Sequence, residues 1–190
     1  MFVNFNKQIR ILFSSSFKSL NYQSTIHKMS SSLKNLSDFN HTTISNGAGM
    51  RIGIVLAEWN IGITGALRDG TVKTLLENGV TENDIAIKYV PGSFELTFGA
   101  QLMCEDKSID AVICLGCVIQ GETRHFDFIC DAVAQGVTNV SLKYNKPVIF
   151  GVLTTNTLLQ AQDRAGGKHG NKGDEAAITA IKMVTLKKSF

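Results

Sequence analysis

The sequence is poor in proline, in aromatic residues and in charge. Its 190 residues include only two prolines, 8% aromatic and 18% charged residues, against 17 glycines and a hydrophobic share of 44%. This composition excludes a proline-rich or disordered polymer and indicates a packed core with tight turns. No run reaches the roughly 18 uncharged apolar residues that a membrane-spanning helix needs. We therefore expect a soluble protein with no membrane partner.

The sequence also lacks the basic surface typical of nucleic-acid-binding proteins. The formal net charge is +3, but residues 1–50 hold five lysines and arginines against one acid, so they carry +4 and the remainder carries −1. A nearly neutral folded part lacks the excess of positive charge that attracts a phosphate backbone. We expect no nucleic-acid partner.

The cysteines are few and do not form a recognisable metal site. Cys114 and Cys117 are spaced as CxxC, while Cys104 and Cys130 stand apart. The CxxC lies in an apolar run that predicts a strand, where residues three apart face opposite sides. No second CxxC completes a zinc site. We expect buried free thiols in a reducing compartment, and no metal.

Residues 1–49 differ in composition from the rest of the chain. They are rich in serine and asparagine, and near the start apolar residues alternate with Lys7, Arg10 and Lys18. This pattern favours a basic amphipathic helix of an organelle-targeting peptide. A disordered extension without a targeting function explains it equally well. We therefore separate an extension, residues 1–49, from a folded domain, residues 50–190. The expected location is the cytoplasm, or an organelle if the extension targets the protein.

After Met50 the pattern alternates between strands and helices. Strands are predicted at 51–57, 85–90, 111–119 and 147–154, and helices at 61–77, 93–105, 125–144, 157–164 and 174–186, with Ser93 as the N-cap of the second helix. Continuous apolar strands are typical of a sheet that is covered on both faces. The sequence therefore predicts a single-domain α/β fold with a four-stranded parallel sheet, in which ligands bind beyond the carboxyl ends of the strands.

Side chains suited to a polar aromatic ligand follow the first two predicted strands. Trp59, the only tryptophan, could stack on a heteroaromatic ring, and Asn60 could bond to donors and acceptors on the ring's edge. A tryptophan closing the rim of the sheet is an equally good explanation. Gly92 would let a ligand approach the backbone, and Glu95 could accept hydrogen bonds from a polyol. Taken alone, Glu95 is better explained by the helix dipole.

Two further segments suit an anion. The glycine-containing turn at residues 120–124 leads into a helix start, where unpaired N–H groups converge. Thr123 could add a hydroxyl, and His125 is a candidate general acid and base because histidine titrates near neutrality. Arg164 directly precedes the glycine-rich segment AGGKHGNKG, which contains Lys168, His169 and Lys172. This density of cations suits phosphate recognition, although a solvated basic loop would look the same. These features predict an α/β domain that binds a phosphorylated small molecule beside an aromatic ring.

Five segments resemble the lumazine synthase family in order and spacing. They are RIGIVLAEWN, VPGSFEL, LGCVIQGETRHFDFIC, VIFGVLTTNT and QDRAGGKHGNKG, and the resemblance covers residues 51–187. It implies a flavodoxin-like sandwich and a cofactor-free transferase of riboflavin biosynthesis. The implied reaction condenses 5-amino-6-(D-ribitylamino)uracil with 3,4-dihydroxy-2-butanone 4-phosphate and releases phosphate and water.

The resemblance also implies the site residues, position by position. His125 matches the proton-transfer residue. The substrate-binding positions are Trp59, Asn60, Ser93, Phe94, Glu95, Cys117, Val118, Ile119, Glu122, Thr123, Phe150, Arg164 and Lys172. By this resemblance Trp59 stacks on the pyrimidine, residues 93–95 hold the ribityl chain, residues 117–119 meet the pyrimidine edge through their backbone, and residues 122–123 cradle phosphate.

The resemblance further implies that the site is shared between subunits. Phe150, Arg164 and Lys172 match residues that reach the site from a neighbour in a pentamer, and the compact loop around Lys172 favours a shell of 60 subunits. Riboflavin synthase is a further candidate partner. Glu122 departs from the family because a small residue is common there. We expect its side chain to turn outward and Arg124 to offset its charge.

Three other functions are compatible with parts of the pattern. A lumazine- or flavin-binding relative without activity would not need His125, Arg164 and Lys172 together. A riboflavin synthase built on the same fold would not need the anion-binding turn. A purely structural shell protein would not need Trp59 and Asn60 at a strand end.

Overall fold

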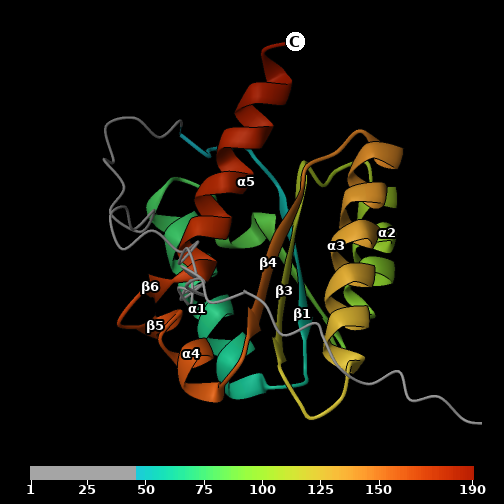
Figure 1. Ribbon diagram of the computed structural model, residues 1–190. Helices are drawn as coiled ribbons and strands as arrows, with labels where there is room; N and C mark the ends of the chain where they lie inside the picture. Colours follow the sequence, from blue (N-terminus) through green and yellow to red (C-terminus); the bar gives the residue numbers. More distant parts are fainter. Residues whose placement is uncertain (1–45) are drawn as a thin grey trace, which may run out of the picture. The chain divides into compact units, whose positions relative to one another are not determined.

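The computed structural model describes residues 46–190 as an α/β fold with a central parallel sheet (Figure 1). The strand order is β2-β1-β3-β4. In chain order the elements are β1 (Ile52–Ala57), α1 (Ile61–Glu77), the 3-10 helix η2 (Glu82–Asp84), β2 (Ile85–Val90), α2 (Leu96–Glu105), β3 (Ala111–Ile119), α3 (His125–Tyr144), β4 (Val148–Thr155), α4 (Leu158–Gln162), β5 (Ala165–Gly167), β6 (Gly170–Asn171) and α5 (Lys172–Lys188). The four-stranded parallel sheet predicted from the sequence is confirmed.

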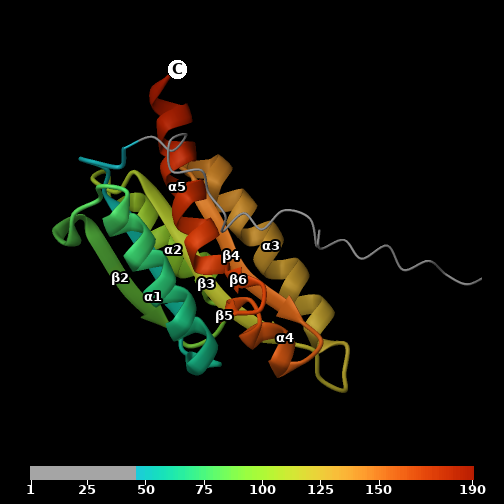
Figure 2. The same ribbon diagram turned by 90° about the vertical axis from the view of Figure 1, so that its left-hand side faces the viewer.

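Helices cover both faces of the sheet, with α1, α4 and α5 on one side and α2 and α3 on the other (Figures 1 and 2). Successive strand residues therefore enter different cores: Ile54 packs on the α1 and α5 side, and Val55 on the α2 and α3 side. The two cysteines of the CxxC divide in the same way, Cys117 into the first core and Cys114 into the second. This confirms that they face opposite sides of the strand and cannot share a metal.

The central pair of strands fixes which loops can meet. β1 pairs with β3 from Ile52 opposite Ala111 to Leu56 opposite Leu115, and all six residues of β1 are buried. β3 continues for four residues beyond this register, to Ile119. The last residues of β3 therefore flank the loop that follows β1.

Most predicted bounds agree with the structure to within two residues. The predicted helices 61–77 and 125–144 and strands 85–90 and 111–119 have the observed bounds, while β4 begins and ends one residue later than predicted. The helix predicted at 157–164 is shorter: Thr157 is its N-cap, accepting from the N–H of Gln160, and the helix ends at Gln162. The glycine-rich segment forms an antiparallel pair, β5 and β6, that the sequence did not predict.

The prediction that Ser93 is the N-cap of the second helix is wrong. α2 begins at Leu96, and Glu95 occupies the N-cap position without a capping side-chain bond. Two turn bonds precede the helix, from the N–H of Glu95 to the carbonyl of Gly92 and from the N–H of Leu96 to the carbonyl of Ser93. These bonds form a turn in which Ser93 is only 7% exposed.

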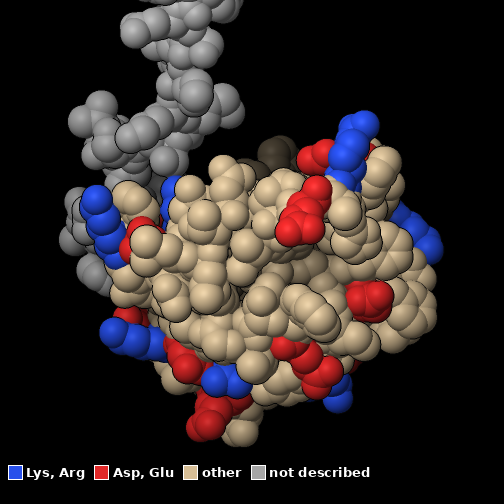
Figure 3. All heavy atoms as spheres, turned by 60° about the horizontal axis from the view of Figure 1, so that its bottom comes forward, with Lys and Arg blue, Asp and Glu red and all other residues tan. Residues whose placement is uncertain are grey.

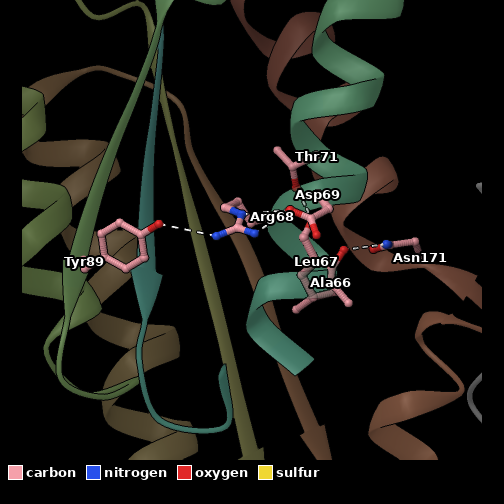
Figure 4. A network of polar contacts seen from close by, with 7 residues as sticks. All are labelled: Ala66, Leu67, Arg68, Asp69, Thr71, Tyr89 and Asn171. Atoms are coloured by element: carbon pink, nitrogen blue, oxygen red, sulfur yellow. Dashed lines mark hydrogen bonds and ion pairs between the residues drawn. The ribbon is translucent and has the colours of Figure 1, made fainter. Parts of the chain in front are cut away.

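Close contacts join α1 to the start of α5. Asn171 donates from Nδ2 to the carbonyl of Ala66 at 2.9 Å, and the Thr71 hydroxyl lies 3.0 Å from the carbonyl oxygen of Gly173 (Figure 4 shows Asn171 and Thr71). Arg68 reaches from α1 to the hydroxyl of Tyr89 on β2 at 3.4 Å. These contacts hold the start of α5 against α1, and α1 in turn against β2.

Replacing Gly173 with alanine should destabilise the fold. A Cβ atom at this position would overlap the carbonyl oxygen of Leu67, a backbone atom that cannot move without shifting α1. We expect Gly173→Ala to lower the free energy of unfolding by about 1–3 kcal/mol, as is typical of overpacking. Urea unfolding at matched subunit concentration measures the change.

Gly65→Ala is the matched control for this substitution. Gly65 also lies in α1, but a Cβ atom there meets nothing within 4 Å. Alanine favours a helix interior over glycine by about 1 kcal/mol, so this variant should be as stable as the parent or more so. Equal stability of the two variants would contradict the packing argument.

Most of the predicted N-terminal extension, residues 1–45, lies outside the described part of the chain. Its targeting role and the compartment of the protein therefore stay predictions. Over residues 46–190, no helix is both long enough and apolar enough to traverse a bilayer.

Candidate active site

A pocket of about 750 Å³ opens where β1, β2 and β3 end, and we call it the strand-end pocket. Its lining residues are Trp59, Asn60, Pro91, Gly92, Ser93, Phe94, Glu95, Cys117, Val118, Ile119, His125 and Ile129. It lies between β1 and β3, where the strand order reverses direction, which is the usual ligand position in such sheets. Figure 3 brings this end of the molecule forward and shows charged side chains mainly around its margin.

Backbone bonds hold the loop after β1 against the loop after β2. The N–H of Glu58 donates to the carbonyl of Val90 at 2.8 Å, and that of Trp59 to Pro91 at 3.0 Å. The Trp59 side chain is 73% exposed and that of Phe94 56%. Two aromatic side chains thus line one pocket with much of their surface available for a planar ring.

Asn60 bridges the two central strands. Its φ of 61° is left-handed, a conformation that asparagine tolerates better than most residues. In this conformation its carbonyl accepts from the N–H groups of Ile63 and Thr64, and its side-chain Nδ2 donates to the carbonyl of Cys117 at 3.0 Å. Asn60 therefore starts α1 and ties the end of β1 to β3.

The turn between β3 and α3 borders the pocket. His125, the first residue of α3, lines it, whereas Glu122 and Thr123 are exposed beside it. The Thr123 hydroxyl accepts from the N–H of His125 at 3.3 Å, which holds the turn close to the histidine. Over residues 46–190, the N–H groups of residues 121–124 donate to no protein acceptor. The turn thus presents consecutive free donors, which suits an anion.

Arg124 does not offset the charge of Glu122, contrary to the expectation from the sequence. Its guanidinium lies 3.5 Å from the carboxylate of Asp127 and 5.8 Å from the centre of the Phe128 ring. Both partners lie in the first turns of α3, so the arginine packs along its own helix. This leaves Glu122 exposed without an ion pair among the described residues.

Three of the predicted site residues lie in a different pocket. Phe150, Arg164 and Lys172 line a pocket of about 530 Å³ between β4, α3 and α5, which shares no lining residue with the strand-end pocket; we call it the β4-edge pocket. Arg164 donates from Nη1 to the carbonyl of Gln160 at 3.0 Å, and Lys172 pairs with Glu175 at 2.6 Å. One chain therefore holds the predicted site residues as two separate groups.

Comparison with known proteins gives the family. A sequence model of the 6,7-dimethyl-8-ribityllumazine synthase family matches residues 49–188. The chain belongs to the lumazine synthase family.

The similarity to individual lumazine synthases extends over nearly their whole length. The synthase of Cytophaga hutchinsonii is 62% identical over 156 residues, which are 82% of this chain and 98% of that protein. The synthase of Parabacteroides distasonis is 54% identical over 158 residues, 83% and 99% of the two chains. That of Porphyromonas gingivalis is 51% identical over 160 residues, 84% and 99%.

The structure of this lumazine synthase family member brings nine predicted positions together in the strand-end pocket: residues 59–60, 93–95 and 117–119, and His125. That they contact substrate stays a prediction. Sequence reasoning missed Ile129 on the pocket wall and Glu175, the partner of Lys172. The spacing of Glu175, three residues after Lys172 in a predicted helix start, was a usable signal for the ion pair.

Burial suppresses the acidity of the two cysteines in β3. It raises the pKa of the Cys114 thiol to about 12 and that of Cys117 to about 11, from an ordinary value of 9.0. Both thiols are therefore neutral at physiological pH. Cys117 can contribute backbone and apolar contacts to the pocket, but no thiolate.

Stability should fall as the pH rises above 9, because thiols in the unfolded chain lose protons there while the folded thiols keep theirs. We expect this fall to be smaller in Cys117→Ala, since the variant has one fewer thiol with a raised pKa. Denaturant unfolding at pH 8 and pH 10 measures the difference between the two proteins. An identical pH dependence would show that the thiol pKa of Cys117 is not raised by folding.

Proposed function

We propose that the protein carries out the reaction for which its family is named. It would condense 5-amino-6-(D-ribitylamino)uracil with 3,4-dihydroxy-2-butanone 4-phosphate to give 6,7-dimethyl-8-ribityllumazine, phosphate and water. The proposal is supported above all by the strand-end pocket, which joins exposed aromatic faces to a turn with free N–H groups. A turnover assay that follows lumazine absorbance tests it, and an inactive assembled protein would instead be a binder without chemistry.

The proposed roles follow the geometry of the pocket. The pyrimidine would stack on Trp59, with its edge toward the backbone of residues 117–119. The ribityl chain would lie along residues 93–95, where Glu95 can accept hydrogen bonds from its hydroxyl groups. The phosphate would bind at the turn formed by Glu122 and Thr123, through backbone N–H groups and the Thr123 hydroxyl.

The proposed chemistry needs proton transfers and close placement of two reactants. The 5-amino group of the pyrimidine would attack the ketone to form an imine with loss of water. Phosphate would then leave by elimination, and the ribitylamino nitrogen would attack the carbonyl carbon that this step unmasks, closing the second ring with loss of a second water. His125 lines the pocket and directly follows the phosphate turn. It could therefore exchange protons with substrate groups bound at either place. Holding the reactants together can contribute more than this exchange, since effective molarities reach about 10⁵ M or higher.

We expect His125→Ala to slow turnover by about 10²- to 10⁴-fold, the usual contribution of a positioned acid or base, without abolishing it. Asn139→Ala is the control because Asn139 is exposed on the same helix, α3, and lines neither pocket. Steady-state turnover of both variants measures the effect. Complete loss of activity in an assembled His125→Ala protein would contradict the dominant role of reactant placement.

The second half of the site would come from a neighbouring copy. Phe150, Arg164 and Lys172 line a pocket separate from the strand-end pocket, so a neighbour's β4-edge pocket must face the strand-end pocket for the two groups to meet. Large apolar side chains are exposed on α2 and α3, including Phe98, 63% exposed, and Leu142, 76% exposed. Such surfaces support self-association.

The proposed assembly is a pentamer or a shell of twelve pentamers. Light scattering or native mass measurement distinguishes the two. Riboflavin synthase, which would consume the product, is the proposed protein partner, and the extension at residues 1–49 would act as a targeting peptide if the protein belongs to an organelle.

The shared site predicts complementation between two impaired variants. Arg164→Ala should weaken binding of the phosphorylated substrate because the guanidinium is the strongest anion ligand in the β4-edge pocket. Refolding it in equal amounts with His125→Ala should restore about a quarter of the parent activity, since random head-to-tail assembly pairs two intact halves at that frequency. Refolding each variant alone is the control. If turnover by the mixture stays as low as that of each variant alone, the site lies within one subunit.

A further inference from the structure

The side chain of Gln120 braces the turn that leads into α3. Its Nε2 donates to the carbonyl of Gly121 at 3.0 Å and lies 3.5 Å from the carbonyl of Thr123. The proposed function assigns this turn to phosphate but assigns nothing to Gln120, which lines neither pocket. The bonds of Gln120 are therefore a separate observation about the same turn.

These bonds determine where the turn's N–H groups point. In a planar trans peptide the C=O and N–H bonds point in opposite directions, and no described peptide here is cis. When Gln120 holds the carbonyls of Gly121 and Thr123, the N–H groups of the same peptides, which belong to Glu122 and Arg124, point away from Gln120. Both donors are thus directed to the open side of the turn.

The turn is anchored at both ends, so the brace has a rigid base. The N–H of Gln120 donates to the carbonyl of Thr155 at 2.8 Å and extends the pairing of β3 with β4 by one residue. At the other end, the Thr123 hydroxyl accepts from the N–H of His125. Between these anchors, Gln120 makes the only side-chain bonds from outside residues 121–124 to the turn carbonyls, among the described residues.

We infer that Gln120 is a positioning residue for the phosphate group of the substrate. It does not touch the ligand. Its amide fixes the peptide units whose N–H groups receive the anion, so the donors are aligned before phosphate binds. The inference rests on the proposed function, since it concerns the phosphate end of that site.

Gln120→Met tests the inference, because methionine keeps the length of the side chain and removes both amide hydrogens without adding charge. Gln135→Met is the matched control: Gln135 is exposed on α3, and its Nε2 donates only to Asp131, four residues before it. Native mass measurement shows that each variant is assembled. The measurements are the KM for each substrate and the dissociation constant of inorganic phosphate, titrated without substrate.

We expect Gln120→Met to raise both the KM for the butanone phosphate and the phosphate dissociation constant by about fivefold to tenfold, the effect of losing one hydrogen bond. The KM for the pyrimidine and all constants of Gln135→Met should stay at the parent values. Unchanged phosphate binding, or an equal rise in both KM values, would overturn the inference. The phosphate dissociation constant is measured without turnover. An inactive parent protein would therefore contradict the proposed function, while phosphate binding by the parent and by Gln120→Met could still be compared.

Discussion

The candidate site depends on the pairing of β1 with β3 at the centre of the sheet. The strand order reverses there, so the chain leaves β1 for α1 on one face and leaves β3 for α3 on the other (Figure 1). Two connections that diverge to opposite faces leave a crevice between the strand ends. The bond from Asn60 to the carbonyl of Cys117 spans this crevice and holds its two sides at a fixed separation. Trp59 and the turn before α3 are placed relative to one another by that bond and by the strand register.

Charge is distributed unevenly between the two pockets. The strand-end pocket offers aromatic faces, backbone groups and one carboxylate, Glu95, whereas the cations Arg164 and Lys172 line the β4-edge pocket. Lys172 is paired with Glu175, so among residues 46–190 Arg164 is the cation of that pocket without a carboxylate partner. In the proposed reaction the pyrimidine would therefore stack on one copy, and the butanone phosphate would meet Arg164 from the next copy. In such an arrangement, assembly and activity depend on the same interface.

The sequence predicted features that depend on local pattern, and missed features that depend on tertiary contacts. Buried strands and long helices were predicted because their apolar residues recur at fixed spacing, and the strand-end residues followed from the parallel topology. Ser93 was misplaced because turn bonds at Gly92 and Ser93 delay the helix, and no pattern of residue types records those bonds. The pair β5 and β6 is too short and too rich in glycine to show a strand period. The separation of Arg164 from Trp59 within one chain follows from no local pattern, and it was expected only from the resemblance to lumazine synthases.

The position of His125 links binding to chemistry in the proposed reaction. The histidine is the first residue of α3 and directly follows the turn that would hold phosphate, and its own N–H is bonded to Thr123 in that turn. One short segment would therefore hold the leaving group and supply the acid that moves protons on the adjoining carbons. Since the segment is fixed to β4 through Gln120 and Thr155, neither group needs to rearrange when substrate arrives. Preformed placement of this kind explains how a site could bring two reactants together with His125 as its one proposed proton-transfer residue.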